Sequence, residues 1–263
     1  MNNLPEKNRI SVVINTYNAA EHLEEVLESV KLFDEIVVCD MESTDDTIAI
    51  ARRHGCKIVT FPKGDAVSAE PARTFAIQSA SNPWVLVVDA DELVTPELRE
   101  YLYRLVAEAN PPQGLYIPRR NQFMGRWMRS LWPDYQLRFF VREGTTWPPY
   151  VHTFPQVNGR VDYADKRAKN TCFIHLDNDT IYKRIEKTNR YTDGEIAKRG
   201  HKRYGWGALL WRPFWRFFRI YFLKGGWRDG VPGLVSAGLT AIYQFAYVAK
   251  IIESHRKSKQ TAN

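Results

Sequence analysis

Cysteine is scarce in this sequence, with three residues, Cys39, Cys56 and Cys172, in a chain of 263. They lie far apart and do not show the paired spacing of metal ligands. An odd and sparse set of this kind argues against a disulfide framework and favours reduced thiols in a cytoplasmic setting.

A long apolar segment is missing at the start of the chain. Residues 1–9 are polar, and the next apolar run, Ile10–Ile14, is far shorter than the core of a signal peptide. We therefore expect no secretory signal. Residues 231–252 are long enough for a membrane span, but Pro232, Gln244 and Lys250 interrupt them. We interpret this segment as one or two interfacial or core-packing helices rather than a span.

Acidic residues become scarce in the last third of the chain. From Asp179 onward there are 17 basic and 6 acidic residues, a balance of +11, which leaves −4 for residues 1–178 out of the total of +7. This asymmetry, with tryptophan and phenylalanine between the basic residues, indicates two parts with separate tasks. The basic part is suited to nucleic acid or to an anionic membrane.

Apolar periodicity predicts alternating strands and helices in the first half of the chain. The predicted strands are Ile10–Asn15, Glu35–Cys39, Lys57–Phe61 and Trp84–Val88, and the predicted helices are Glu21–Leu32, Thr47–His54, Ala69–Ala80 and Pro96–Ala109. This order is typical of a mostly parallel sheet with right-handed crossovers. Further strands are expected at Gly114–Pro118, Gln136–Arg142 and Thr171–His175, and a polar helix at 180–199.

Three carboxylates follow the strongest predicted strand. Asp89, Asp91 and Glu92 come directly after the apolar run Trp84–Val88. Open α/β sheets bind ligands at the carboxyl ends of their strands, and carboxylate oxygens suit Mg²⁺ or Mn²⁺. The sequence therefore predicts a cation held against a phosphate. The alternative is that these residues cap the helix near Pro96, but a cap explains only one of them.

Three ordered motifs carry a family resemblance: residues 10–18, residues 37–47 and the run 87–92 with its Asp-X-Asp signature. Together they resemble the family 2 glycosyltransferases, which act on nucleotide sugars. The resemblance implies an α/β fold of the GT-A (Rossmann-like) type, a nucleotide-sugar-binding sheet with helices on both faces. Residues 1–178 would form the catalytic domain, with a nucleotide-binding half (1–95) and an acceptor half (96–178). Residues 179–263 would form a helical, amphipathic C-terminal segment.

The resemblance also assigns roles in binding a UDP-sugar donor. Asp40 would accept a hydrogen bond from the uracil N–H, which suits an acceptor-only carboxylate, and Thr16 and Asn18 would lie beside the base. Arg73 would lie near the uracil or the diphosphate. For Asp40 the alternative is a helix N-cap, although Ser43 and Thr44 already offer one. For Arg73 the alternative is a solvated helix residue.

The metal ligands implied by the resemblance are Asp91, Asp89 and His175. Asp91 would hold Mg²⁺ or Mn²⁺ directly, Asp89 would contact the ribose or the waters of the metal, and His175 would add a metal or diphosphate contact. A buried histidine whose hydrogen bonds are satisfied within the protein is the equally weighted alternative for His175.

The second half is similar to bacterial lipopolysaccharide inner-core β-1,4-glucosyltransferases. This likeness rests on residues 134–140, Val151-His152, Ile174-His175 and the tail motif at 221–230. Inverting transfer to a hydroxyl needs a general base, and Asp134 and His152 are the candidates. The subfamily usually has glutamate where this chain has Thr153, so both candidates stay open. Arg138 would bind diphosphate or an anionic acceptor, or would pair with a core carboxylate.

We therefore expect an inverting, metal-dependent hexosyltransferase, with UDP-glucose as donor and a lipid-linked lipopolysaccharide core or related glycan as acceptor. It would be cytoplasmic and peripheral on the inner face of the bacterial cytoplasmic membrane, bound to anionic lipid through its basic aromatic tail. Covering the core or forming a homodimer are the alternatives for that tail.

Other functions fit the sequence less well. A polyprenyl-phosphate glycosyltransferase would need no base, which suits the missing glutamate. A nucleotidyltransferase would normally have a Gly-rich, basic loop after the first strand, and residues 16–20 contain neither Gly nor Lys. Nucleic-acid binding would leave the carboxylates unexplained, so we expect no nucleic-acid partner.

Overall fold

A computed structural model describes residues 5–66, 68–149, 153–168, 170–176, 180–199 and 202–261. The chain divides into two units, which we call the sheet unit (Met1–Arg120 with Pro133–Leu176) and the helical unit (Asn121–Trp132 with Asp177–Asn263). The sequence-based division at residue 178 assigned residues 121–132 to the first domain. In the structure they group with the helical unit instead.

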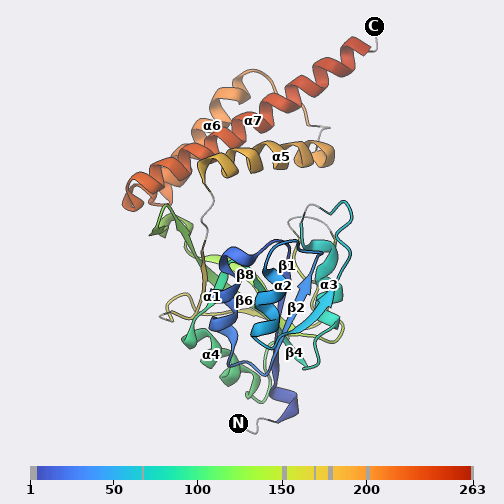
Figure 1. The fold of residues 1–263 in the computed structure, drawn as a ribbon. Coiled ribbons are helices and arrows are strands. Elements are labelled where there is room, and N and C mark those ends of the chain that lie inside the picture. Colours follow the sequence, from blue (N-terminus) through green and yellow to red (C-terminus); the bar gives the residue numbers. More distant parts are fainter. Residues whose placement is uncertain are drawn as a thin grey trace. The chain divides into compact units, whose positions relative to one another are not determined.

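The sheet unit is built on a mixed sheet with the strand order β3-β2-β1-β4-β8-β6-β10-β5 (Figure 1). Its strands are β1 Ile10–Thr16, β2 Glu35–Asp40, β3 Lys57–Thr60, β4 Trp84–Asp89, β5 Glu92–Val94, β6 Gly114–Phe123, β8 Asp134–Val141, β9 Val161–Tyr163 and β10 Phe173–His175. The first four strands in that order are parallel, as their alternation with helices predicts. Strand β8 runs antiparallel to both β4 and β6, so the second half of the sheet changes direction.

Helices cover both faces of this sheet, as predicted. Helices α1 (Ala20–Val30), α2 (Thr47–Arg53) and α4 (Pro96–Val106) contribute Leu27, Ala51 and Leu102 to one buried cluster. Helix α3 (Glu70–Gln78) contributes Ala72 and Ala76 to a second cluster on the other face. Alternate residues of β1 enter the two clusters, which is the period-two pattern of a strand buried on both faces.

The parallel strands bring polar residues to one edge of the sheet. Strand β1 ends at Thr16, β2 at Asp40 and β4 at Asp89. In the strand register Thr16 lies opposite Asp40, and Asn15 lies opposite Asp89. Residues that are 24 and 74 positions apart in the sequence therefore lie next to each other at the carboxyl edge.

The caps of α2 and α4 bear on two interpretations of the sequence, one expected and one argued against. The prediction that Ser43 and Thr44 cap α2 is wrong, since the Asp45 carboxylate accepts the Thr47 N–H at 3.0 Å. Helix α4 begins at Thr95, whose hydroxyl accepts the Leu98 N–H at 3.2 Å. Because Thr95 fills this role, the carboxylates at 89–92 are not needed as caps.

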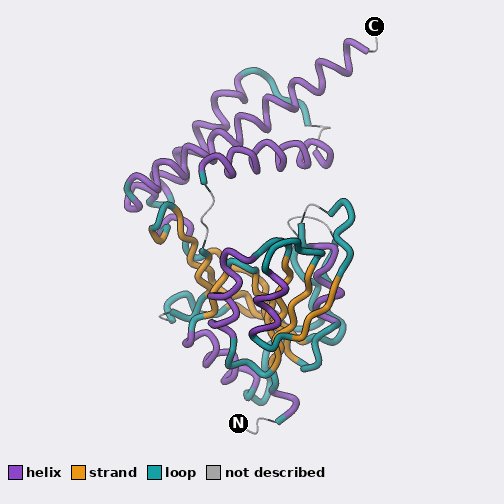
Figure 2. The backbone as a smooth tube through the Cα atoms, in the orientation of Figure 1, coloured by secondary structure: helices purple, strands orange, loops and turns teal. Residues whose placement is uncertain are grey.

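Three long helices, α5 (Ile181–Arg199), α6 (Gly207–Phe218) and α7 (Val231–Thr261), make up most of the helical unit and are drawn in purple in Figure 2. Between α6 and α7 lie a π-helical turn η3 at Arg219–Leu223 and a short 3-10 turn η4 at Gly226–Asp229. Residues 231–252 thus belong to one continuous helix. Within the described chain, α7 is the one helix whose length and composition would allow a membrane crossing, over Val231–Lys257.

The tail motif at 221–230 connects the C-terminal helices to residues 121–132 within the helical unit. Asp229 is fully buried, and its carboxylate accepts the backbone N–H groups of Arg129 (2.9 Å) and Ser130 (3.0 Å). These belong to a 3-10 turn, η2 (Arg129–Leu131), that follows the hairpin of β6 and β7 (Arg126–Trp127). Gly233 packs so closely on the Gly226 carbonyl that a Cβ would overlap that oxygen. A motif that resembles a subfamily signature therefore has a structural role here.

Candidate active site

Asp40 organises one corner of the carboxyl edge. It is almost fully buried, and its Oδ1 accepts hydrogen bonds from Thr16 Oγ1 (2.9 Å) and Ser43 Oγ (2.6 Å). Its Oδ2 accepts the Ser43 N–H at 2.9 Å. These bonds fix the turn after β2. The predicted contact of Asp40 with a base would have to use the remaining lone pair of the carboxylate.

Asn18 joins the loop after β1 to the same turn. Its backbone has a φ of +49°, a left-handed conformation that asparagine tolerates better than most residues. Its N–H donates to Ser43 Oγ at 2.9 Å, and its side-chain oxygen accepts the Thr44 N–H at 2.8 Å. Thr16, Asn18 and Asp40 are thus brought together, and their contact with a base stays a prediction.

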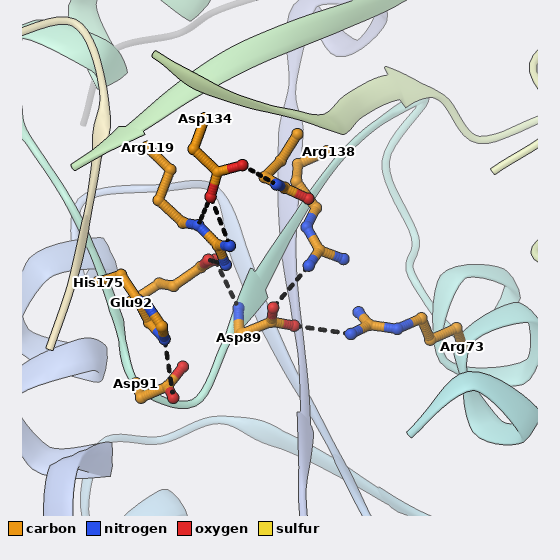
Figure 3. Close-up of polar contacts among 9 residues, drawn as sticks. Arg73, Asp89, Asp91, Glu92, Arg119, Asp134, Arg138 and His175 are labelled. Carbon is orange, nitrogen blue, oxygen red and sulfur yellow. Dashed lines mark hydrogen bonds and ion pairs between the residues drawn. The ribbon is translucent and has the colours of Figure 1, made fainter. Parts of the chain in front are cut away.

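Asp89 lies between two arginines (Figure 3). Arg73 Nη2 donates to its Oδ1 at 2.8 Å, and Arg138 Nη2 donates to its Oδ2 at 2.6 Å. Both arginine side chains are 8% exposed, so Arg73 is not a solvated helix residue. Of the two predictions for Arg138, the pairing with a core carboxylate is observed.

The buried indole ring of Trp147 contacts the guanidinium groups of both arginines. The sequence alone does not indicate this residue. The Arg73 guanidinium lies 4.5 Å from the centre of the indole ring, and that of Arg138 lies 5.1 Å away. The loop holding Trp147 is fixed to α3, because Thr74 Oγ1 bonds both the carbonyl and the N–H of Trp147 at 2.9 Å. Cation–π contact with a buried ring holds the guanidinium groups in place.

The charges of this cluster decide the protonation of Asp89. Burial alone would raise the pKa of Asp89, but the positive charges of Arg138 and Arg73 outweigh it and hold the pKa well below its ordinary value. Asp89 is therefore ionised throughout the physiological range. Glu92 lies close enough to offset the second positive charge of this pair. Each arginine uses Nη2 for Asp89, and its buried Nε and Nη1 have no hydrogen-bond partner among the described residues, so these donors suit an anionic group.

Asp91 and His175 form the neighbouring part of the edge. His175 Nε2 lies 3.3 Å from Asp91 Oδ2, and the Asp91 side chain is 47% exposed. Burial disfavours a charged imidazole, but the hydrogen bond and charge of Asp91 raise the pKa of His175 overall. A carboxylate and an imidazole this close are a suitable pair of metal ligands.

The predicted trio of Asp91, Asp89 and His175 is not assembled as a three-ligand set. Among the residues that the structure describes, no group of three His, Cys, Asp or Glu side chains is placed to hold a metal ion. Asp89 is held away from the pair by its two arginines, whereas Asp91 and His175 lie together. These two remain the predicted ligands, and Asp89 fits the indirect role in which it contacts ribose or the waters of the metal.

Glu92 and Asp134 are joined by Arg119, a residue that the sequence analysis did not single out. Arg119 donates to Glu92 Oε1 at 2.8 Å and, through Nε and Nη2, to Asp134 Oδ2 at 2.9 and 2.7 Å. Gln136 Nε2 donates to Asp134 Oδ1 at 3.0 Å. Glu92 is fully buried and also accepts the Asp89 N–H, so it links the two ion clusters. Asp134 is the first residue of β8.

His152, the other candidate base, lies outside the described residues. The neighbouring Thr153 is described, and its hydroxyl donates to the Pro148 carbonyl at 3.0 Å.

Arg119 and Trp147 belong to the site, yet the sequence offers only weak signals for either of them. A single arginine such as Arg119, one residue beyond the predicted strand Gly114–Pro118, has no sequence pattern that reveals its partners, which here are 15 and 27 positions away.

Comparison with known proteins identifies the family. The model of glycosyl transferase family 2 matches residues 11–159, which contain nearly all the residues described above. This chain belongs to glycosyltransferase family 2. The Asp-X-Asp residues and the arginine cluster of this glycosyltransferase therefore lie within the part that defines its family.

Among its relatives, two examples match this glycosyltransferase over nearly the full length of both chains. An uncharacterized glycosyltransferase of Rickettsia felis is 30% identical over 95% of this chain and 92% of its own. LpsC of Rhizobium meliloti, a lipopolysaccharide core biosynthesis glycosyltransferase, is 27% identical over 94% of this chain and 93% of its own.

Solved structures show the same fold. The mannosyltransferase PcManGT from Pyrobaculum calidifontis, solved with GDP-Man and Mn²⁺, is 16% identical with a TM-score of 0.54 over 93% of this chain and 87% of its own. TarS 1–349 of Staphylococcus aureus is 15% identical with a TM-score of 0.50 over 95% and 92%. At these identities the likeness establishes the GT-A fold alone.

Proposed function

We propose that this glycosyltransferase transfers a hexose, glucose, from a UDP-sugar to a lipopolysaccharide core or related surface glycan, with inversion and with a divalent cation. The observation that carries the proposal is the arrangement at the end of β4. There the Arg73–Asp89–Arg138 cluster, whose guanidinium groups keep unused donors, stands two residues before the half-exposed Asp91, which pairs with His175. This arrangement suits the diphosphate of the leaving UDP. The likeness to LpsC supports the acceptor class.

The protein would act mainly by positioning and by charge. Asp40 and the Thr16–Asn18 loop would bind the uracil, and Asp89 would contact the ribose. Arg73 and Arg138, held rigid by Trp147, would stabilise the negative charge that grows on the diphosphate as the glycosidic bond breaks. Mg²⁺ or Mn²⁺ on Asp91 and His175 would neutralise the same group. Asp134, or else His152, would take the proton from the acceptor hydroxyl.

Calorimetric binding of nucleotides tests this proposal. UDP, UDP-glucose, UDP-galactose, UDP-N-acetylglucosamine and GDP-mannose would each be titrated with Mn²⁺ and with EDTA. We expect UDP-glucose to bind most tightly with Mn²⁺, and Asp91→Asn to reduce its affinity to the level seen with EDTA. Asp162→Asn, a surface carboxylate of β9 that pairs with Arg160, serves as the control. The proposed function would be wrong if no nucleotide bound under any condition.

One observation favours a second candidate, a polyprenyl-phosphate glycosyltransferase. Where the lipopolysaccharide subfamily usually has glutamate, Thr153 uses its hydroxyl to bond the Pro148 carbonyl. An acceptor phosphate is already ionised and needs no base. Transfer of the sugar to polyprenyl phosphate, with no transfer to a lipopolysaccharide core acceptor, would select this candidate.

We also propose that the helical unit binds an anionic membrane surface. Helix α6 has no buried residue, and its exposed aromatic face consists of Trp211 (62%), Phe214 (57%) and Trp215 (43%). Arg212 and Arg216 lie on the same helix. Aromatic rings suit the interfacial region of a bilayer, and arginines suit lipid phosphates. Only 28% of the most apolar stretch of α7 is buried within the protein, which also favours an apolar surrounding.

A further inference from the structure

Helices α5 and α7 enclose a groove of about 340 Å³ within the helical unit. Its volume lies in the range of small-molecule sites, about 300–1,000 Å³. Six of its lining residues bear the argument: Arg184, Lys187 and Tyr191 on α5, and Ser236, Thr240 and Tyr243 on α7. Their spacings, i, i+3, i+7 and i, i+4, i+7, place each set on one face of its helix.

The wall formed by α5 is cationic. Arg184 and Lys187 both line the groove, and none of its eight described lining residues is acidic. The Arg184 guanidinium lies 4.1 Å from the centre of the Phe123 ring, and Phe123 is itself buried. This cation–π contact restricts the arginine before any ligand arrives. A restricted guanidinium beside an ammonium group is suited to a phosphate.

The wall formed by α7 carries hydroxyl groups. Thr240 Oγ1 donates to the Ser236 carbonyl at 2.9 Å, so its hydroxyl proton is used and its lone pairs can accept from a ligand hydroxyl. Ser236 lies one helical turn before it on the same face. Tyr191 and Tyr243 add a ring from each wall, and aromatic rings offer flat apolar surfaces against which a sugar ring can lie.

We propose that this groove binds a phosphorylated sugar, with the phosphate against Arg184 and Lys187 and the sugar hydroxyls against Ser236 and Thr240. The inference rests on the proposed function, because an acceptor with a phosphorylated glycan headgroup is the substrate class that would carry this chemistry. The helical unit would then recognise the acceptor, separately from the donor residues of the sheet unit.

Isothermal titration of the full chain tests the groove, with N-acetylglucosamine 6-phosphate as probe and N-acetylglucosamine and inorganic phosphate as its parts. We expect the phosphosugar to bind at least about tenfold more tightly than either part. The double variant R184Q/K187Q should weaken it by about tenfold or more, the loss expected for charge-assisted hydrogen bonds. Circular dichroism would show that the variant is folded.

Two matched variants separate a specific site from general charge. K183Q/R203Q removes the same charge from two exposed positions of the helical unit outside the groove and should leave binding intact, whereas equal weakening by both double variants would overturn the inference. S236A/T240V changes no charge and should weaken the phosphosugar but not inorganic phosphate. If it weakened neither, the sugar part of the inference would be wrong.

Vesicles containing lipid A, whose headgroup is a phosphorylated glucosamine disaccharide, distinguish a lipid source from a free phosphosugar. Binding to these vesicles that free phosphosugar displaces, and that R184Q/K187Q loses, supports a glycolipid headgroup. Binding of the free phosphosugar alone supports a soluble ligand of the same chemistry. If the protein bound UDP-glucose but neither the phosphosugar nor the lipid A vesicles, this inference would be wrong and the proposed function would stand. If it bound the phosphosugar but no nucleotide, the proposed function alone would be wrong.

Discussion

Asp89 and Asp91 stand two positions apart in one motif, yet their surroundings differ. Asp89 is enclosed by two buried guanidinium groups, whereas Asp91 is half exposed and contacts one histidine. The sequence indicates that both are functional. It does not indicate that one of them also pairs with two buried cations, because those cations come from α3 and β8.

The first prediction follows from this difference. Asp89→Asn should lower the free energy of unfolding by about 3–5 kcal/mol, because it leaves buried arginines without their counter-charge. Asp91→Asn should change it by less than about 1 kcal/mol. Urea unfolding followed by circular dichroism measures both values. Equal losses for the two variants would show that the arginines do not depend on Asp89.

A second prediction at this scale concerns pH and Glu35. Burial opposes ionisation of Glu35, but hydrogen bonds from the Ser11 hydroxyl and from the N–H and hydroxyl of Ser81 outweigh it and lower its pKa. A lowered folded-state pKa gives stability that is present above the unfolded value of about 4.3 and is lost as pH falls through the folded value.

Glu35→Gln should therefore be less stable than the natural protein by about 1 kcal/mol at pH 7. The difference between the two should shrink as the pH falls below 4.3. Chemical unfolding across pH 3–7 measures it. Glu28→Gln, which removes an exposed partner of Lys31, is the control and should have little effect. A difference that stays constant with pH would contradict the assigned hydrogen bonds.

At the scale of elements, the apolar periodicity of the sequence predicts the helices and strands but not how distant strands pair. Strands β1 to β4 and helices α1 to α4 were all anticipated within a few residues, because each has its own apolar periodicity and a turn or cap at its ends. The reversal of direction at β8 was not anticipated. Strand direction depends on which distant strand pairs with it, here β4, which precedes it by about 50 residues. Likewise, Arg119 and Trp147 reach the site only through such long-range pairing.

The buried carboxylate of η4 gives a prediction for the hairpin. Asp229→Ala should lower the free energy of unfolding of the helical unit by about 3 kcal/mol, because two backbone N–H groups lose a charged acceptor. Hydrogen exchange at the amides of Arg129 and Ser130 should become faster. Asp193→Ala, which removes an exposed partner of Lys250, is the control and should leave that exchange unchanged.

Two glycines of α7 offer a matched pair. Gly233→Ala should destabilise the helical unit, because the new methyl group would overlap the Gly226 carbonyl. Gly238→Ala meets no atom within 4 Å and should stabilise the helix by about 0.5–1 kcal/mol. Thermal unfolding compares them. Destabilisation by both would indicate that helix contacts other than this close approach decide the outcome.

For the whole molecule, the proposed binding of the aromatic face of α6 to an anionic membrane gives a prediction. The triple variant W211S/F214S/W215S should lose co-flotation with anionic vesicles, because the rings that would enter the bilayer interface are gone. The control L32S/F75S removes two exposed apolar residues from the sheet unit and should retain it. If the triple variant instead converts a dimer to a monomer in light scattering, the face is a contact between two copies of the chain.

The bond between Asp229 and Arg129 also has a consequence for synthesis on the ribosome. The two residues are 100 positions apart, and at about 5–20 residues per second this interval lasts on the order of ten seconds. During this time the nascent hairpin has emerged while its anchor has not been made. A stop codon after residue 176 would yield a polypeptide that keeps the hairpin permanently unanchored. A design that shortens this enzyme should therefore replace residues 121–132 as well as remove the tail.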